Sequence, residues 1–263
     1  MFIGMGINLV RGGAMFSPAN LFAAGENGAW YDPSDLSTMF QDAAGTIPVT
    51  APGQPVGLIK DKSGRGNHAS QTTPGNRPIY QTDGSGRSFL VFNGTSSFVT
   101  PSAVQTGSSD KMQVFCGVRK LNDAGIGCIA ELRSSSTLNP GTFHIRAPAT
   151  AAGKSYRFVC GGTALSGSTQ VTYAAPISNV LTFTSDIGAS TSSIRINASL
   201  KLVNTQTQGT GGFISYPLYI GSSNGFLLFN GNIYSLILRF GDNLSSQQIS
   251  STENWVNLAT GAY

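Results

Sequence analysis

The chain has 263 residues and a net charge of +4, with 33 glycines, 12 prolines and only 11% charged residues. This length suits one large β-domain or two small domains, and the many turn formers and few charges argue against long amphipathic helices. The basic residues are scattered, and the densest group, Lys60, Lys62 and Arg65, is interpreted as a solvated turn. We therefore predict no nucleic-acid partner, because nucleic-acid-binding proteins concentrate positive charge on one face.

Residues 1–26 form a glycine-rich segment that differs from the rest of the chain. Its glycines alternate with apolar residues without a helical or strict strand period, and these apolar side chains would be poorly hidden in a free monomer. We interpret it as an arm for docking or oligomerisation, with a frayed terminus that packs on its own domain as the alternative. The arm residues are Phe2, Ile3, Met5, Ile7, Leu9 and Val10.

The apolar start of the chain does not have the form of a targeting segment. It has no basic residue before Arg11 and no small-residue cleavage site, so we predict no signal peptide. No run approaches the roughly 20 apolar residues that span a bilayer. We expect synthesis in the cytoplasm and no membrane partner.

The main domain is expected over residues 27–263. A predicted helical turn at 17–23, with Ser17 as N-cap and Pro18 at the first helical position, leads into it. Short apolar or alternating runs then follow, separated by Gly, Asn, Asp and Pro, and they predict an all-β fold, a two-sheet antiparallel sandwich. The predicted strands are 29–31, 78–81, 89–92, 112–119, 127–132, 142–146, 156–160, 170–173, 180–184, 193–197, 200–204, 218–220 and 231–240.

Two turns and one helix complete the expected elements. The alternation over 193–200 predicts a reversal at Asn197-Ala198, and Asn230-Gly231-Asn232 predicts positive-φ residues ahead of a strand that is apolar on both faces, as in a central strand. Ser245 to Gln248 has the capping-box pattern, and apolar or small residues recur beyond it at helical spacing. We predict a helix over 246–258 that caps an edge of the sandwich.

The three cysteines, Cys116, Cys128 and Cys160, are odd in number and lack close CxxC spacing. Reduced, buried thiols are the expected state. Alternatively, Cys116 and Cys128 face each other across a hairpin that turns near Asn122 and Asp123, which would permit a disulfide in an oxidising compartment. The residues leave both readings open.

Several strings resemble the concanavalin A-like, laminin G-like domains. They are WYDPSDLS at 30–37, DKSGRGNH at 61–68, Arg77-Pro78, Phe92-Asn93-Gly94, Ile220-Gly221, FNGNI at 229–233 and Leu244-Ser245. The resemblance covers roughly residues 28–260, although the middle, about 100–210, carries no motif. It implies a jelly-roll sandwich with a short terminal helix.

The string FSPANLF at 16–22, which runs into 30–36, resembles phage and prophage virion proteins that carry this domain. The resemblance implies a tail-fibre, collar, spike or head-decoration protein, located on the virion, with other virion proteins as partners. It further implies a symmetric homo-oligomer and favours a trimer, whereas the residues themselves leave the oligomer order open.

The 61–68 string has two interpretations. Its glycines permit positive φ, and its Asp and Asn side chains can bond the turn's own backbone. Related domains sometimes bind calcium, but Lys62 and Arg65 stand where a calcium site would gain from carboxylates. We therefore favour plain turn chemistry and predict no metal and no cofactor.

Enzymatic residue sets are missing from the sequence. Glycoside hydrolases of this superfamily carry Glu-x-Asp-x-x-Glu, whereas Glu131 has no acidic partner two residues away. The two histidines, His68 and His144, are far apart, and each is interpreted as a packed or hydrogen-bonding residue. We predict no catalytic residue and a non-enzymatic protein.

Three functions follow as hypotheses. The leading one is a virion structural protein with the arm for assembly and the sandwich as an exposed adhesive head. The alternative is a lectin-like module that binds host surface glycans at loop ends or on a concave sheet, and the third, a bacterial surface adhesin, needs an export route that the sequence does not show. Aromatic rings stack on sugars but more often pack in cores. The candidate glycan contacts are Tyr156, Tyr173, Tyr216, Tyr219 and Trp255.

Overall fold

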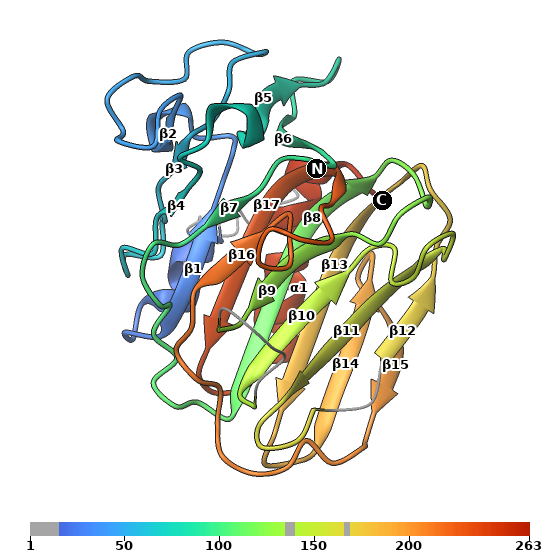
Figure 1. Ribbon diagram of the computed structural model, residues 1–263. Helices are drawn as coiled ribbons and strands as arrows, with labels where there is room; N and C mark the ends of the chain where they lie inside the picture. Colours follow the sequence, from blue (N-terminus) through green and yellow to red (C-terminus); the bar gives the residue numbers. More distant parts are fainter. Residues whose placement is uncertain (1–15, 135–139, 166–168) are drawn as a thin grey trace, which may run out of the picture.

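A computed structural model of the chain describes residues 16–134, 140–165 and 169–263. Over these residues the strands form two antiparallel sheets, sheet A and sheet B, which pack as a sandwich, with α1 against one of them (Figure 1). This confirms the predicted fold class. The predicted arm residues lie outside the described residues, so the arm stays a prediction.

The strands of both sheets follow a spatial order that differs from their order in the sequence. Sheet A comprises β15 (Ser199–Asn204), β14 (Thr191–Ile196), β13 (Ile177–Asp186), β8 (Lys111–Lys120), β17 (Asn230–Phe240), β6 (Ser88–Asn93) and β5 (Ile79–Thr82), with β1 (Asn27–Tyr31) also paired to β17. Sheet B comprises β12 (Thr169–Thr172), β11 (Ser155–Gly161), β10 (Thr142–Arg146), β9 (Cys128–Leu132), β16 (Leu218–Ile220), β7 (Phe98–Val99), β4 (Ala69–Ser70), β3 (Leu58–Ile59) and β2 (Met39–Phe40). The helices are η1 (Pro18–Phe22), η2 (Leu36–Thr38), η3 (Pro74–Asn76) and α1 (Ser246–Thr260).

The inner faces of the two sheets share one hydrophobic core. Successive side chains of a strand point to opposite faces, so every second residue is buried between the layers. The ring of Phe158 in sheet B lies 5.1 Å from that of Phe183 in sheet A, and Phe92 and Phe98 meet across the layers at 6.1 Å. Each of these rings is fully buried, and replacing one with alanine costs about 3–5 kcal/mol in comparable cores.

The outer face of sheet A is covered by α1 and η1. Phe115 and Ile237, on the central strands β8 and β17, point outward and are buried beneath Val256 of α1 and Leu21 of η1. The predicted helix is confirmed, with the Ser245 capping box, but it lies on the face of β8, β13 and β17, so the prediction that it caps an edge is wrong. Central strands that are apolar on both faces need such a cover. None of the described helices is long and apolar enough to cross a bilayer.

Every predicted strand corresponds to an observed strand, with end shifts of a few residues. Strands β10 and β16 have the predicted bounds, and β17 is a central strand as predicted. Four strands of sheet B were not predicted, namely β2, β3, β4 and β7. Each has two residues, which is too short to show a period of two.

The two predicted turns have different outcomes. Asn197 and Ala198 have φ of 51° and 58°, which confirms the tight reversal between β14 and β15. The prediction of positive φ at 230–232 is wrong, because Asn230, Gly231 and Asn232 are the first residues of β17. Gly231 is needed for close packing instead, since a Cβ there would lie 2.3 Å from the Phe229 ring.

The hairpin that would join Cys116 and Cys128 does not form. Cys116 lies on β8 in sheet A, whereas Cys128 lies on β9 in sheet B, so the chain between them crosses from one layer to the other. Both thiols are buried and form no disulfide. Burial raises the pKa of each thiol, in line with the expected reduced state.

The loop 61–68 is held together by the Asp61 carboxylate. One of its oxygens accepts hydrogen bonds from the backbone N–H groups of Trp30 and Ser63, both at 2.8 Å. The other accepts the Ser63 hydroxyl at 2.7 Å and the Asn67 N–H at 3.0 Å. The loop is therefore tied to β1 by the turn chemistry that the sequence predicts.

We predict that Asp61→Ala lowers the unfolding free energy by about 2 kcal/mol or more, because buried N–H groups lose their acceptor. Urea denaturation followed by tryptophan fluorescence measures the change. Asp242→Ala, at an exposed carboxylate, is the matched control and is expected to change stability by no more than about 0.5 kcal/mol. Equal losses in the two variants would contradict the role of Asp61.

Candidate functional site

The outer face of sheet B carries polar and charged side chains on neighbouring strands. In β10, Phe143 and Ile145 belong to the core between the sheets, so His144 and Arg146 point to the outer face. The same alternation in β11 turns Phe158 inward and Arg157 outward. Period-two alternation thus places the charged residues of neighbouring strands on one surface.

Strand register arranges these side chains in two rows across the sheet. A bulge where β9 meets β10 brings Cys128, rather than Ile129, opposite Arg146. The first row is Tyr219, Glu131, His144 and Val159, on β16, β9, β10 and β11. The second row is Cys128, Arg146, Arg157 and Gln170, on β9, β10, β11 and β12.

Glu131 is fully buried in the first row, with an arginine beside it. Arg133 lies 3.4 Å from one of its carboxylate oxygens and donates a 2.9 Å hydrogen bond to the Ser223 hydroxyl. The other carboxylate oxygen is buried without a hydrogen-bond partner. Burial raises the pKa of Glu131, although Ser223 and the nearby Arg133 and Arg146 oppose the shift.

His144, opposite Glu131, is held neutral by its surroundings. It is 2% exposed, and neither of its ring nitrogens has a hydrogen-bond partner. Burial lowers its pKa to about 3, and the positive charges of Arg146, Arg157 and Arg133 act in the same direction. The neutral ring offers one donor and one acceptor to a ligand.

Arg146 and Arg157 are direct cross-strand neighbours of the same charge. Both are half-buried, and the Nε atom of each is buried without a partner. Burial and the charge of Arg146 lower the pKa of Arg157. Within the described ranges, neither guanidinium forms an ion pair with a carboxylate.

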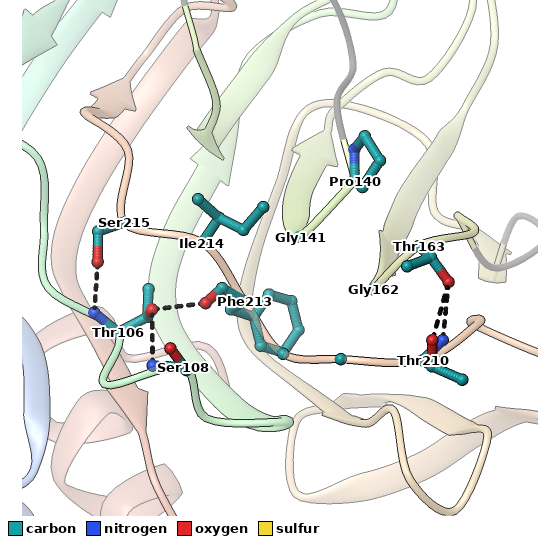
Figure 2. Close-up of a pocket in the computed structure, with 12 residues that line it drawn as sticks. Thr106, Ser108, Pro140, Gly141, Gly162, Thr163, Thr210, Phe213, Ile214 and Ser215 are labelled. Atoms are coloured by element: carbon teal, nitrogen blue, oxygen red, sulfur yellow. Dashed lines mark hydrogen bonds between the residues drawn. The ribbon is translucent and has the colours of Figure 1, made fainter.

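A second candidate is a cavity of about 460 Å³ at one end of sheet B, near the starts of β8 and β10 (Figure 2). The hydroxyl groups of Thr106 and Thr163 form hydrogen bonds within it. Thr106 donates to the Phe213 carbonyl at 2.6 Å, and Thr163 accepts the Thr210 N–H at 2.9 Å. This cavity has neutral, largely satisfied polar groups, whereas the sheet face has buried groups that lack partners.

The five predicted glycan contacts do not lie together. Tyr156 is fully buried in the core, where its hydroxyl accepts a hydrogen bond from Asn179, and Tyr173 and Tyr216 pack against the same core. Trp255 lies on α1, with its ring edge-on to Trp30 at 5.6 Å. Tyr219, half-buried beside Glu131, is the member of the set that lies in the polar rows of sheet B.

The other residues singled out in the sequence serve the fold. Lys62 is paired with Asp32 and Asp35 at 2.8 and 2.9 Å, and these partners raise its pKa although its burial acts in the opposite direction. His68 accepts the Asp61 N–H through Nδ1 at 3.0 Å. The described part of the chain contains no group of three or more His, Cys, Asp or Glu residues that could hold a metal ion.

Sequence reasoning missed the arginines and treated Glu131 and His144 as isolated. The available signal was the alternation in 142–146, which places Thr142, His144 and Arg146 at every second position, and the single Arg157 between Tyr156 and Phe158. The sequence does not reveal the order of strands in sheet B, in which β9, β10 and β11 are neighbours. The site exists only through that order.

No protein-family model and no curated protein matches the sequence. Among solved structures, the binding domain of botulinum neurotoxin serotype G has a TM-score of 0.56 at 15% identity, over 76% of this chain and 48% of that domain. A structure of botulinum neurotoxin type C, whose cell entry depends upon interaction with two ganglioside molecules, has a TM-score of 0.54 at 14% identity. The match covers 75% of this chain and 48% of the neurotoxin chain. A mutant GH54 α-L-arabinofuranosidase soaked with 4-nitrophenyl α-L-arabinofuranoside has a TM-score of 0.64 at 16% identity, over 93% of this chain and 66% of the enzyme chain.

This chain spans about half the length of the neurotoxin domains, with 48% of the serotype G domain covered. At these identities the comparisons show a shared fold, the two-sheet sandwich. That fold occurs here in receptor-binding domains and in a glycosidase, so the function must be argued from the side chains.

The histidine gives a pH-dependent prediction. His144 has a pKa of about 3 in the folded protein against 6.5 for an ordinary histidine, so the unfolded chain binds the extra proton. The stability linked to His144 is therefore complete above about pH 6.5 and is lost as the pH falls towards the folded pKa. Between pH 7 and pH 5, the unfolding free energy should fall by about 2 kcal/mol more in the wild type than in His144→Gln.

Urea denaturation of both proteins at each pH measures this difference. Glu131 titrates in both proteins, so the comparison isolates His144. The same pH dependence in the two proteins would contradict a neutral, buried His144.

Proposed function

We propose that this protein is a non-enzymatic, lectin-like recognition module that binds glycans on the outer face of sheet B. The observation that carries the proposal is the first polar row, in which Glu131 and His144 are buried with unpartnered polar atoms. A buried polar group without a partner costs about 1–3 kcal/mol, and such groups in folded proteins call for an explanation. Sugar hydroxyl groups, which both donate and accept hydrogen bonds, can supply the missing partners once the half-buried side chains around this row move aside.

Tyr219 adds an aromatic surface to this row. It is half-buried beside Glu131, so it combines an exposed ring portion with a polar neighbour. Aromatic rings with adjacent hydrogen-bonding groups suit the mixed apolar and polar surface of a sugar. The loop-end cavity lacks this combination, which is why the sheet face is the favoured site.

Binding without catalysis is favoured by the surroundings of Glu131. Glycoside cleavage commonly uses a pair of carboxyl groups, about 5–5.5 Å apart in retaining enzymes and about 6.5–9.5 Å apart in inverting ones. The cross-strand neighbours of Glu131 are His144 and Tyr219, and its ion-pair partner is Arg133. The similarity to the GH54 enzyme therefore supports a shared scaffold without a shared acid and nucleophile.

A glycan array tests the proposal. The wild-type protein is expected to bind a subset of glycans, and Tyr219→Ala is expected to weaken that binding about tenfold or more through the lost ring contact. The matched control is Leu258→Ala, at an exposed position of α1 on the other side of the sandwich, which should bind as the wild type does. No glycan binding by the wild type, or an equal loss in both variants, would contradict the proposal.

The second candidate is a structural role in a phage virion, in which the outer face of sheet B binds glycans on the host surface. The specific feature in its favour is β15, the edge strand of sheet A, which exposes Leu200, Leu202 and Val203. An edge strand with exposed apolar residues fits contact with a neighbouring subunit. The 16–22 string and the glycine-rich arm favour the same assembly role.

Deleting residues 1–15 tests this second candidate. The truncated protein is expected to fold, because it keeps η1, whose Leu21 covers the outer face of sheet A, yet to be lost from purified particles. Particles are compared by mass spectrometry after complementation with either form of the gene. Normal incorporation of the truncated protein would contradict an anchoring role for the arm.

A further inference from the structure

We infer that Arg146 and Arg157 bind an anionic group of the ligand, a carboxylate or a sulfate ester of an acidic glycan. The inference rests on the proposed glycan-binding role and assigns the chemical class of the ligand. It is carried by the second polar row, which the glycan proposal above leaves unused.

Two like charges are paired in this row. Arg146 and Arg157 stand directly opposite each other on adjacent antiparallel strands and on the same face. Such a pair is destabilising unless a negative charge lies between the two groups. Glu131, the carboxylate of the neighbouring strand, is engaged by Arg133 and has a raised pKa, so it compensates the pair poorly.

The arginine pair is partly desolvated. The Nε atoms of both arginines are buried and lack partners, and His144 beside them is 2% exposed with two unpartnered ring nitrogens. Water is thus partly removed from groups that would bind it strongly in the open. A partly buried positive charge attracts an anion more strongly than a solvent-exposed positive charge does.

The guanidinium group suits an anionic ligand of this kind. Its planar fork donates parallel hydrogen bonds that match the two oxygens of a carboxylate or sulfate. Two forks on neighbouring strands can share one anion or hold two oxygens of the same group. The neutral His144 ring can then donate to, or accept from, an adjacent sugar hydroxyl.

A neutral glycan would leave this row without a function. Its hydroxyl groups satisfy Glu131 and His144 but leave the repulsion between Arg146 and Arg157 unchanged. An acidic glycan satisfies both rows together. The ligand class is therefore an acidic sugar, with its charged group over the arginine pair.

The experiment measures binding to matched glycan pairs that differ only in charge. The pairs are sialylated and desialylated oligosaccharides, oligogalacturonates and their methyl esters, and sulfated and desulfated disaccharides. The first two pairs report a carboxylate and the third a sulfate ester. We expect the acidic member of at least one pair to bind about tenfold more tightly than its neutral counterpart.

The variants Arg146→Gln and Arg157→Gln should each remove most of that preference, while Arg119→Gln, at an exposed arginine of β8 in sheet A, should retain it. A parallel titration uses sodium sulfate against sodium chloride at equal ionic strength and follows the arginine Nε–H signals by NMR. We expect sulfate to shift the signals of Arg146 and Arg157 but not that of Arg119.

The outcomes separate this inference from the proposed function. Binding of neutral glycans alone would overturn the inference and leave the glycan module standing. A sulfate response at Arg146 and Arg157 without any glycan binding would support an anion site at the arginine pair, but it would overturn the proposed function and the assignment of the ligand as a glycan. Unchanged charge preference in both arginine variants, or equal sulfate shifts at Arg119, would overturn the inference.

Discussion

The structure depends on burying one face of each sheet against the other. Rings such as Phe158 and Phe183 meet between the layers, and the period of two along a strand then sends each neighbouring side chain outward. In sheet A the outward residues of β8 and β17 include the apolar Phe115 and Ile237, which pack against Val256 of α1. In sheet B the outward residues of β9, β10 and β11 are largely polar, so the same constraint that builds the core also builds the candidate site.

Much of the fold follows from local signals in the sequence. Alternation predicted the long strands, the Asn197-Ala198 turn was visible as a reversal, and the Ser245 capping box marked the start of α1. The failures concern relations between distant segments. The two-residue strands have no period to detect, and the chain after β8 crosses to sheet B rather than forming a hairpin, which local patterns do not encode.

The candidate site depends even more than the fold on contacts between distant segments, which local sequence patterns do not encode. Glu131, His144 and Arg157 lie on three separate segments and become neighbours only because β10 pairs with both β9 and β11. Aromatic residue type was a poor guide to this surface, since Tyr156 belongs to the inward positions of β11. Residue type provided only candidate sugar contacts, whereas strand order determines which polar residues share a surface.

The central claim is that the outer face of sheet B is where this protein binds its ligand. Chemical-shift mapping of the isotope-labelled protein with the tightest-binding glycan of the array tests it most directly. The account predicts that the largest shifts fall on the backbone amides of β9, β10 and β11, around His144 and Arg157. Largest shifts around α1, or in the loops that line the cavity near Thr106 and Thr210, would contradict it.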